Sequence, residues 1–125
     1  LIFGLEKWNG RRHTYVVEGP LDSLFIDNCL AVGGADFGHL GVLVDKTKTT
    51  IIFDNEPRNK EIVRRMEKII SDGWNICIWS EKILEKDIND MVIAGQTPEE
   101  IQGVINRNSF TGLKAKFKMN GWKKC

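Results

Sequence analysis

Residues 16–22 read VVEGPLD and residues 51–56 read IIFDNE, and these two stretches decide the fold. Each is an apolar, β-branched run that stops abruptly at acidic residues. A run without polar alternation is typical of a strand that is buried on both faces, as in a parallel sheet covered by helices. The two stretches therefore predict buried strands that end in Glu18 and in Asp54 with Glu56.

Helical patterns alternate with these strands along the chain. Residues 58–73 read RNKEIVRRMEKIISDG, in which the apolar positions follow a helical stripe before Gly73 ends it. Thr97 and Glu100 form a capping box around Pro98, which predicts a further helix start. The stretch 74–80, WNICIWS, is typical of another strand. The alternation predicts an α/β fold with a mostly parallel sheet covered by helices.

The remaining segments are less regular. Residues 21–28 predict a short helix with Leu21, Leu24 and Phe25 on one face. Residues 35–49 fit either a short helix or a packed loop. Residues 113–119, LKAKFKM, alternate as a strand would, but Leu113 and Phe117 are also helix-spaced, and we favour a helix.

Composition limits the class of protein. The chain has 125 residues, 42% of them hydrophobic and 28% charged, which is typical of one globular domain. No apolar run approaches the ~20 residues that span a bilayer, so we expect no membrane partner. Cys29, Cys77 and Cys125 are odd in number and far apart, which favours neither a disulfide framework nor a zinc site and predicts a reducing, cytoplasmic setting. Because the chain begins with Leu1 rather than Met, we expect a fragment of a longer protein.

Charge is unevenly distributed along the chain. The formal net charge is only +1, yet residues 107–125 contain six basic residues and no acid, which leaves 12 basic against 17 acidic residues in the rest. An acidic body with a basic tail favours an anionic partner near the C-terminus, such as nucleic acid. A solvated helix face would have the same composition, so both interpretations remain.

The acidic strand ends predict a metal site. In open α/β sheets the functional crevice lies beyond the carboxyl ends of the strands, so Glu18 and Asp54 should meet there, with Glu56 on the same side as Asp54. Asp22 follows Glu18 closely, and Asp87 and Asp90 follow the last strand. Carboxylates brought together repel one another unless a cation lies among them, and all-oxygen ligation suits Mg²⁺ or Mn²⁺. Alternatively, single acids such as Asp22 or Asp90 only cap helices.

The motifs also resemble a known family. VVEGPLD, a strand ending in DNE, and KDIND at 86–90 are similar to the Toprim domain shared by primases, topoisomerases, certain nucleases and recombination proteins. The longer runs VVEGPLDSLF and FDNEPRNKEIV and the tail GWKK resemble the DNA primases of T-even-type bacteriophages. The resemblance implies a compact sheet of about four parallel strands, with a Toprim domain over residues 1–95 and a helical, basic extension over residues 96–125.

The resemblance implies synthesis of short RNA primers on a single-stranded DNA template from ribonucleoside triphosphates. Mg²⁺ or Mn²⁺ would be the cofactor, and a replicative helicase in the host cytoplasm a partner. Glu18 matches the glutamate that acts as a metal ligand or general base, and Asp54 and Glu56 match the metal-binding D-x-D pair. Glu56 departs from the usual aspartate, which predicts a shifted or water-bridged second metal. By position, Asp22 and Asp87 match further acids at the site, and Lys86 could face a triphosphate. Arg58 and Lys60 are further candidates for phosphate contacts, and Arg11 and Arg12 for the template backbone. The alternative for each of these basic residues is a plain surface charge.

Two other functions remain open. A Toprim nuclease would use the same acids to nick DNA without nucleoside triphosphates. A non-catalytic scaffold would bind DNA or protein through the basic tail, including Lys116 and Lys118, and through Trp122, unless Trp122 packs against the preceding helix. A topoisomerase is disfavoured because Tyr15, the only tyrosine, lies inside a predicted strand.

Overall fold

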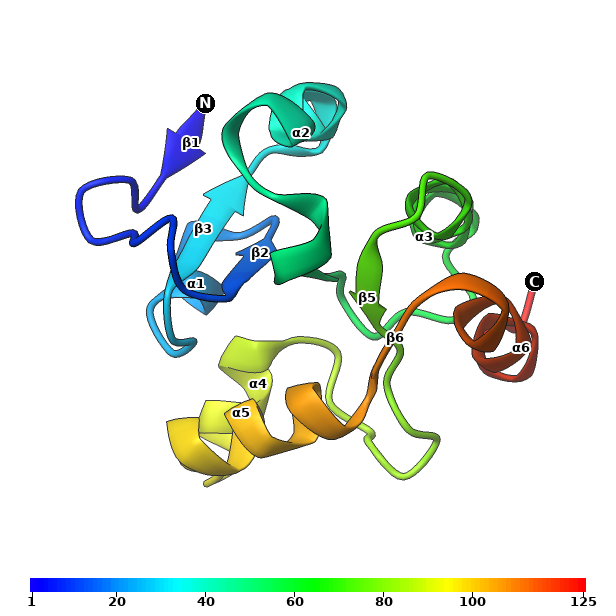
Figure 1. The fold of residues 1–125 in the computed structure, drawn as a ribbon. Coiled ribbons are helices and arrows are strands. Elements are labelled where there is room, and N and C mark those ends of the chain that lie inside the picture. The colour runs from blue at the N-terminus through cyan, green and yellow to red at the C-terminus, as the bar shows by residue number, and fades with distance from the viewer.

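A six-stranded sheet forms the centre of the molecule (Figure 1). The computed structural model describes residues 1–125, apart from the side chains of residues 34–36. The strand order is β1-β3-β2-β4-β5-β6, and β3, β2, β4 and β5 are mutually parallel. The strands are β1 (Ile2–Phe3), β2 (Thr14–Val17), β3 (Cys29–Val32), β4 (Thr49–Ile52), β5 (Asn75–Cys77) and β6 (Ser109–Phe110).

The two edge strands correct the predicted four-stranded sheet. The central parallel strands agree with the prediction, but β1 pairs antiparallel with β3 and β6 pairs antiparallel with β5. Each edge strand has only two residues. Two residues are too few to show an alternating pattern in the sequence. The pairing of such a strand is decided by the neighbouring strand.

Helices cover both faces of the sheet, with α2 and α3 on one side and α4 and α5 on the other (Figure 1). Tyr15 of β2 links the sheet to α5, because its hydroxyl donates a hydrogen bond of 2.6 Å to Asn106 Oδ1 of that helix. This burial of Tyr15 agrees with its predicted place inside a strand. The helices are α1 (Pro20–Ser23), α2 (Leu40–Leu43), α3 (Lys60–Ser71), α4 (Ile88–Ile93), α5 (Pro98–Arg107) and α6 (Gly112–Trp122), with 3₁₀ turns η1 (Gly34–His39) and η2 (Lys46–Lys48).

Local signals account for the longer helices. All five apolar positions predicted to face the core from α3 are buried, and the Asn59 side chain caps its first turn. The capping box of Thr97 and Glu100 is present at the start of α5. Residues 113–119 are helical, as favoured, within α6. The open segment 35–49 contains η1, α2 and η2.

The helix predicted over residues 21–28 is wrong in length and in its buried face. Helix α1 ends at Ser23, which is buried, whereas Leu21 and Leu24 are 54% and 64% exposed. A four-residue helix cannot present a complete apolar stripe, so the periodic pattern had no physical basis there.

The core fills the space between the sheet and both helix layers. Val16 of β2, Ile51 of β4 and Ile76 of β5 are fully buried. The three cysteines are unpaired thiols, as predicted. Among the described residues, no helix is both long and apolar enough to cross a bilayer.

Candidate active site

The carboxyl ends of β2 and β4 bring Glu18 and Asp54 to one edge of the sheet. The two strands are adjacent and parallel, with Val16 opposite Ile51. Glu18 follows β2 directly, and Asp54 follows β4 after the buried Phe53. The predicted meeting of the acidic strand ends is therefore a feature of the fold.

Asp54 lies at the centre of the acidic residues. No hydrogen bond or ion pair to its carboxylate is found in the part of the chain that the structure describes. Burial, and then the charges of the neighbouring carboxylates of Asp22, Asp87, Glu56 and Glu18, raise the pKa of Asp54 to about 6. The Asp54 carboxylate is thus partly desolvated, and no cation of the described residues compensates its charge.

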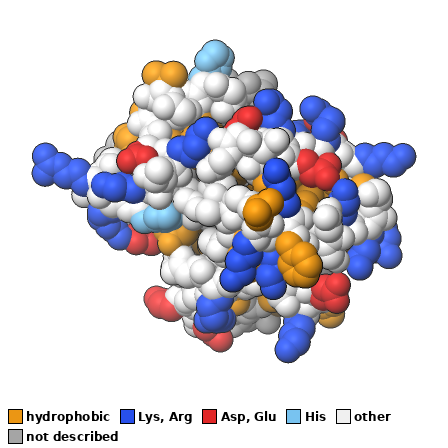
Figure 2. Space-filling view, turned by 45° about the vertical axis from the view of Figure 1, so that its right-hand side comes forward, with side chains coloured by type: hydrophobic (Ala, Val, Ile, Leu, Met, Phe, Trp, Pro, Cys, Tyr) orange, Lys and Arg blue, Asp and Glu red, His pale blue; other side chains and the backbone are white. Residues whose placement is uncertain are grey.

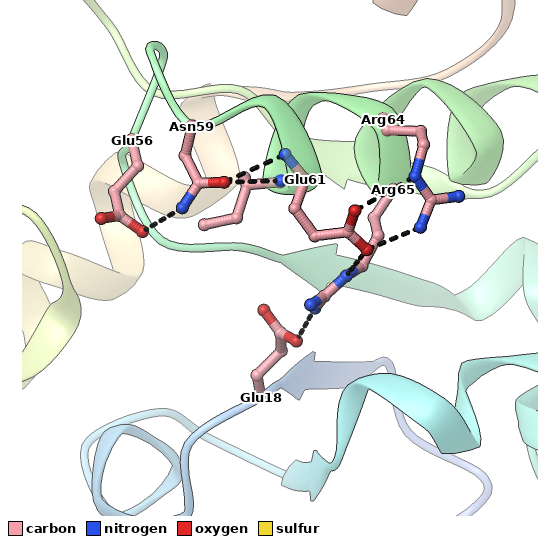
Figure 3. Close-up of polar contacts among 7 residues, drawn as sticks. Glu18, Glu56, Asn59, Glu61, Arg64 and Arg65 are labelled. Carbon is pink, nitrogen blue, oxygen red and sulfur yellow. Dashed lines mark hydrogen bonds and ion pairs between the residues drawn. The ribbon is translucent and has the colours of Figure 1, made fainter.

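Glu18 is held by a cation from the opposite helix layer (Figure 3). Arg65 of α3 reaches down to form an ion pair with Glu18, and the two side chains are 31% and 26% exposed. Glu61, one helical turn before Arg65, accepts hydrogen bonds from both Arg64 and Arg65. Arg65 therefore joins Glu18 to a second group of charged residues on α3, a contact that the sequence analysis missed.

Asp22 and Asp87 both contact the N-terminus of α4. The Asp87 side chain caps this helix by accepting a hydrogen bond of 2.8 Å from the Asp90 backbone N–H. Asp22, which belongs to α1, accepts one of 2.9 Å from the preceding N–H, that of Asn89. The capping role that we left open for Asp22 is thus observed, and Asp90 contributes its backbone rather than its side chain.

Glu56 is turned away from the geometry expected of an extended D-x-E pair. The Glu56 N–H donates to the Asp54 carbonyl at 2.9 Å, so the segment forms a tight turn. The Glu56 carboxylate then lies 3.6 Å from the Lys86 ammonium and 3.5 Å from the Asn59 side-chain amide. Residues 54–56 therefore form a turn rather than the predicted extended segment, although the Glu56 charge still raises the pKa of Asp54.

Asn55 holds this turn in place, and sequence reasoning missed it. Its side-chain amide donates to the carbonyls of Ile83 and Glu85 at 3.0 and 3.1 Å, and its backbone N–H donates to that of Lys86 at 2.6 Å. Its side-chain oxygen accepts a hydrogen bond of 3.0 Å from the Trp122 indole. Asn55 therefore fixes the acidic turn against the segment before α4 and against α6. In the sequence, only the position of Asn55 between two acidic residues could have indicated this role.

The predicted phosphate-binding residues divide into two groups. Lys86 lies beside Glu56, and Arg58 and Lys60 are exposed at the start of α3. Arg11 and Arg12 precede β2, so they lie at the opposite edge of the sheet from Glu18, where Arg12 pairs with Asp27. The structure thus does not bring Arg11 and Arg12 to the acidic residues.

Comparison with known proteins finds a similar protein. The chain is 36% identical over 125 residues to the DNA primase of Enterobacteria phage T4. The chain is similar to part of a phage primase. The match covers 98% of the chain and 36% of the length of that primase. No family model matches the chain.

The similarity covers both acidic strand ends and the helices that frame them. It supports a primase-related protein. Within the described residues, no group of three or more His, Cys, Asp or Glu side chains is arranged as a preformed metal site. The donor set nevertheless fits a hard divalent cation, because it consists of carboxylates and includes Asp54, whose charge is uncompensated.

Proposed function

We propose that this chain is the Toprim-type catalytic part of a phage DNA primase. In this proposal it joins ribonucleotides into short RNA primers on a single-stranded DNA template with Mg²⁺ or Mn²⁺ at the acidic edge. The similarity to the phage T4 primase and the parallel sheet with acids at its carboxyl edge support it. Residues 1–95 would form the catalytic unit, and residues 96–125 would supply its basic extension.

The observation that carries the proposal is the partly buried carboxylate of Asp54, beside other acids and without a cation among the described residues. A partly buried carboxylate beside other acids is costly unless a cation compensates its charge. No protein cation approaches Asp54 among the described residues, whereas Arg65 pairs with Glu18 and Lys86 approaches Glu56. In the proposal, a divalent cation would compensate the Asp54 charge.

Each acidic residue then has a role in the proposal. Asp54 would be the principal ligand, with Glu56 beside it and Asp22 and Asp87 lending their remaining lone pairs. Glu18 would accept the proton of the primer 3′-hydroxyl or complete the ligand set, and for either it must first leave Arg65. The bound metal would supply charge neutralisation at the reacting phosphates.

The basic residues near the acidic edge would contact the phosphates. Lys86 is the best placed, because its ammonium already lies 3.6 Å from the Glu56 carboxylate. Arg58 and Lys60 are exposed near this turn, where their side chains would bind the phosphates of a nucleoside triphosphate. Arg11 and Arg12 would contact only a strand that passes the opposite edge. A replicative helicase remains the expected partner of the whole primase.

The metal proposal is tested by Mn²⁺ binding, followed by electron paramagnetic resonance. Asp54→Asn should weaken binding at least about tenfold, because it removes the uncompensated ligand. Asp27→Asn is the matched control, since Asp27 is an exposed acid at the opposite edge. In the full-length protein, Asp54→Asn should lower primer synthesis by about 100-fold or more. Equal Mn²⁺ binding by the two variants would refute the metal site. Nicking of DNA without nucleoside triphosphates would favour the nuclease function over primer synthesis.

Helix α6 offers a surface for the template strand. Lys114 and Lys118 lie 5.6 and 5.2 Å from the centre of the Phe110 ring, and Leu113 and Phe117 are 82% and 76% exposed. Figure 2 shows basic side chains around hydrophobic ones on the side of the molecule where Figure 1 places α6. Aromatic and basic side chains together suit single-stranded nucleic acid.

The template contact is tested by reversing two charges on α6. Lys116→Glu with Lys118→Glu should weaken binding of oligodeoxythymidylate and lower the salt slope of log K by about 0.7 for each lost phosphate contact. Lys7→Glu with Lys82→Glu makes the same change of charge at exposed positions outside α6. An identical salt slope for both double variants would show that α6 does not contact the DNA.

A further inference from the structure

A hollow lies on the face of the sheet that α2 and α3 cover. Its volume is about 740 Å³, which is within the range of small-molecule sites. Phe53, Ile69 and Trp74 contribute apolar surface, and Phe37 of η1 lies against Phe53 with the ring centres 5.4 Å apart. Phe37 stays partly exposed, so it is available to a ligand. The carboxylates proposed to bind the metal do not line this pocket; they are Glu18, Asp22, Asp54, Glu56 and Asp87.

The rim of the pocket is cationic. Four cations line it, Lys46, Arg64, Arg65 and Lys68, against two acids, Glu61 and Asp72. The Lys46 ammonium lies 5.1 Å from the centre of the Trp74 ring and also donates to the Asp72 carbonyl. The excess of positive charge favours an anionic ligand.

The existing ion pairs do not block such a ligand. Lys68 pairs with Asp72 at 3.4 Å, and Arg64 pairs with Glu61 at 2.6 Å, with the Lys68 and Arg64 side chains 71% and 66% exposed. Exposed pairs of this kind stabilise a protein little, so phosphate oxygens can replace the carboxylates at small cost. Arginine in particular binds phosphate through two parallel hydrogen bonds.

We propose that the pocket between α2 and α3 binds a nucleotide unit. The base packs against Phe37 beside Trp74, and the phosphate lies between Arg64 and Lys68. The combination decides the class of ligand, because an apolar floor with aromatic rings suits a base and a cationic rim suits its phosphate. The nucleotide is either free or part of a single strand. The inference deepens the proposed function by giving the primase a nucleotide site apart from its acidic edge.

Arg65 connects the pocket with the acidic edge. Its side chain lines the pocket and at the same time pairs with Glu18 (Figure 3). A phosphate in the pocket competes with Glu18 for this guanidinium. Occupation of the pocket should therefore weaken the ion pair between Arg65 and Glu18.

Binding to the 125-residue chain in EDTA tests the pocket without any metal. The probes are ATP, inorganic triphosphate and fluorescein-labelled oligodeoxythymidylate, measured by calorimetry and fluorescence anisotropy. Lys68→Glu and Phe37→Ala should each weaken binding of the nucleotide probe about tenfold, whereas Lys82→Glu, at an exposed position outside the pocket, should change it less than twofold. Circular dichroism melts verify that each variant folds, and Phe37→Leu, a milder change, should lose less affinity than Phe37→Ala.

The probes separate the two sources of the nucleotide. Binding of ATP that the pocket variants weaken assigns a free nucleotide, and binding of the oligonucleotide alone, weakened in the same way, assigns a strand. No binding of either at millimolar concentration, equal losses in Lys82→Glu and Lys68→Glu, or equal affinity for inorganic triphosphate and ATP would overturn the inference. Because the assay contains no divalent cation, failure of the acidic site leaves its result unchanged.

Discussion

At the scale of single residues, Asp54 links the stability of the fold to its proposed activity. Burial, and then the neighbouring carboxylates, raise the pKa of Asp54 from 3.8 to about 6. Between these two pH values the folded chain binds more protons than the unfolded chain, so the free energy of unfolding falls as pH rises. Above pH 6 the full cost of the buried charge is present.

Asp54→Asn should therefore stabilise the metal-free protein. The amide keeps the shape and removes the charge, so we expect the free energy of unfolding at pH 7.5 to increase by about 1–3 kcal/mol, and the gain to disappear near pH 4. Urea denaturation in EDTA at both pH values measures this. Glu61→Gln should have the opposite sign at pH 7.5, because hydrogen bonds from Arg64 and Arg65 lower the pKa of Glu61. A loss of stability in Asp54→Asn at pH 7.5 would contradict the argument.

Divalent cations should reverse this ranking. A ligand that binds only the folded state stabilises it by about 2.7 kcal/mol at a hundred times its dissociation constant. Saturating Mg²⁺ should thus raise the melting temperature of the wild-type chain and leave that of Asp54→Asn nearly unchanged, as measured by calorimetry at pH 7.5. Equal shifts in both proteins would mean that the cation binds elsewhere.

At the scale of elements, α4 depends on acids that we also propose as metal ligands. The Asp87 side chain and the Asp22 side chain each hold one N–H of its first turn. A helix of six residues has few internal hydrogen bonds, so its position relies on these contacts and on the buried Ile88 and Met91. The same carboxylates consequently have a structural role whether or not a metal binds.

Two substitutions at residue 87 separate the structural role from the charge. Asparagine is also a good N-cap, so Asp87→Asn should keep the stability of the wild-type chain within about 0.5 kcal/mol, whereas Asp87→Ala should lose about 1 kcal/mol. Both variants remove the charge and should weaken Mn²⁺ binding alike. The measurements are urea denaturation and Mn²⁺ titration. Normal Mn²⁺ affinity in Asp87→Asn would show that Asp87 is a cap only.

At the scale of the whole molecule, α6 is tied to the acidic edge. Helix α6 packs on α3, and Trp122 at its end is only 5% exposed, so Trp122 packs into the fold rather than presenting a free ring. Its indole N–H donates to Asn55 at 3.0 Å. The C-terminal helix α6 and the acidic turn are therefore in direct contact.

Trp122→Phe should destabilise the whole chain by about 1–3 kcal/mol. It removes the hydrogen bond and leaves the Asn55 side-chain oxygen without its partner, while an aromatic ring still fills much of the space. Phe117→Ala on the same helix is the control, because Phe117 is 76% exposed and its loss should cost within about 0.5 kcal/mol. Thermal unfolding followed by circular dichroism compares the two. A larger loss in Phe117→Ala would mean that α6 buries its other face.

The sequence by itself determined the parallel centre of the sheet, the stripe of α3, the capping box at Thr97 and the acids at the strand ends. These features depend on the period of the chain and on neighbours within one turn, which are local properties. Only the tertiary structure decided the edge strands, the turn at Glu56 and the partners of each acid. Arg65 meets Glu18 across 47 residues and Trp122 meets Asn55 across 67, and no local pattern records such contacts. The pocket between α2 and α3 arose in the same way, because its rings and cations come from separate elements that only the packed sheet brings together.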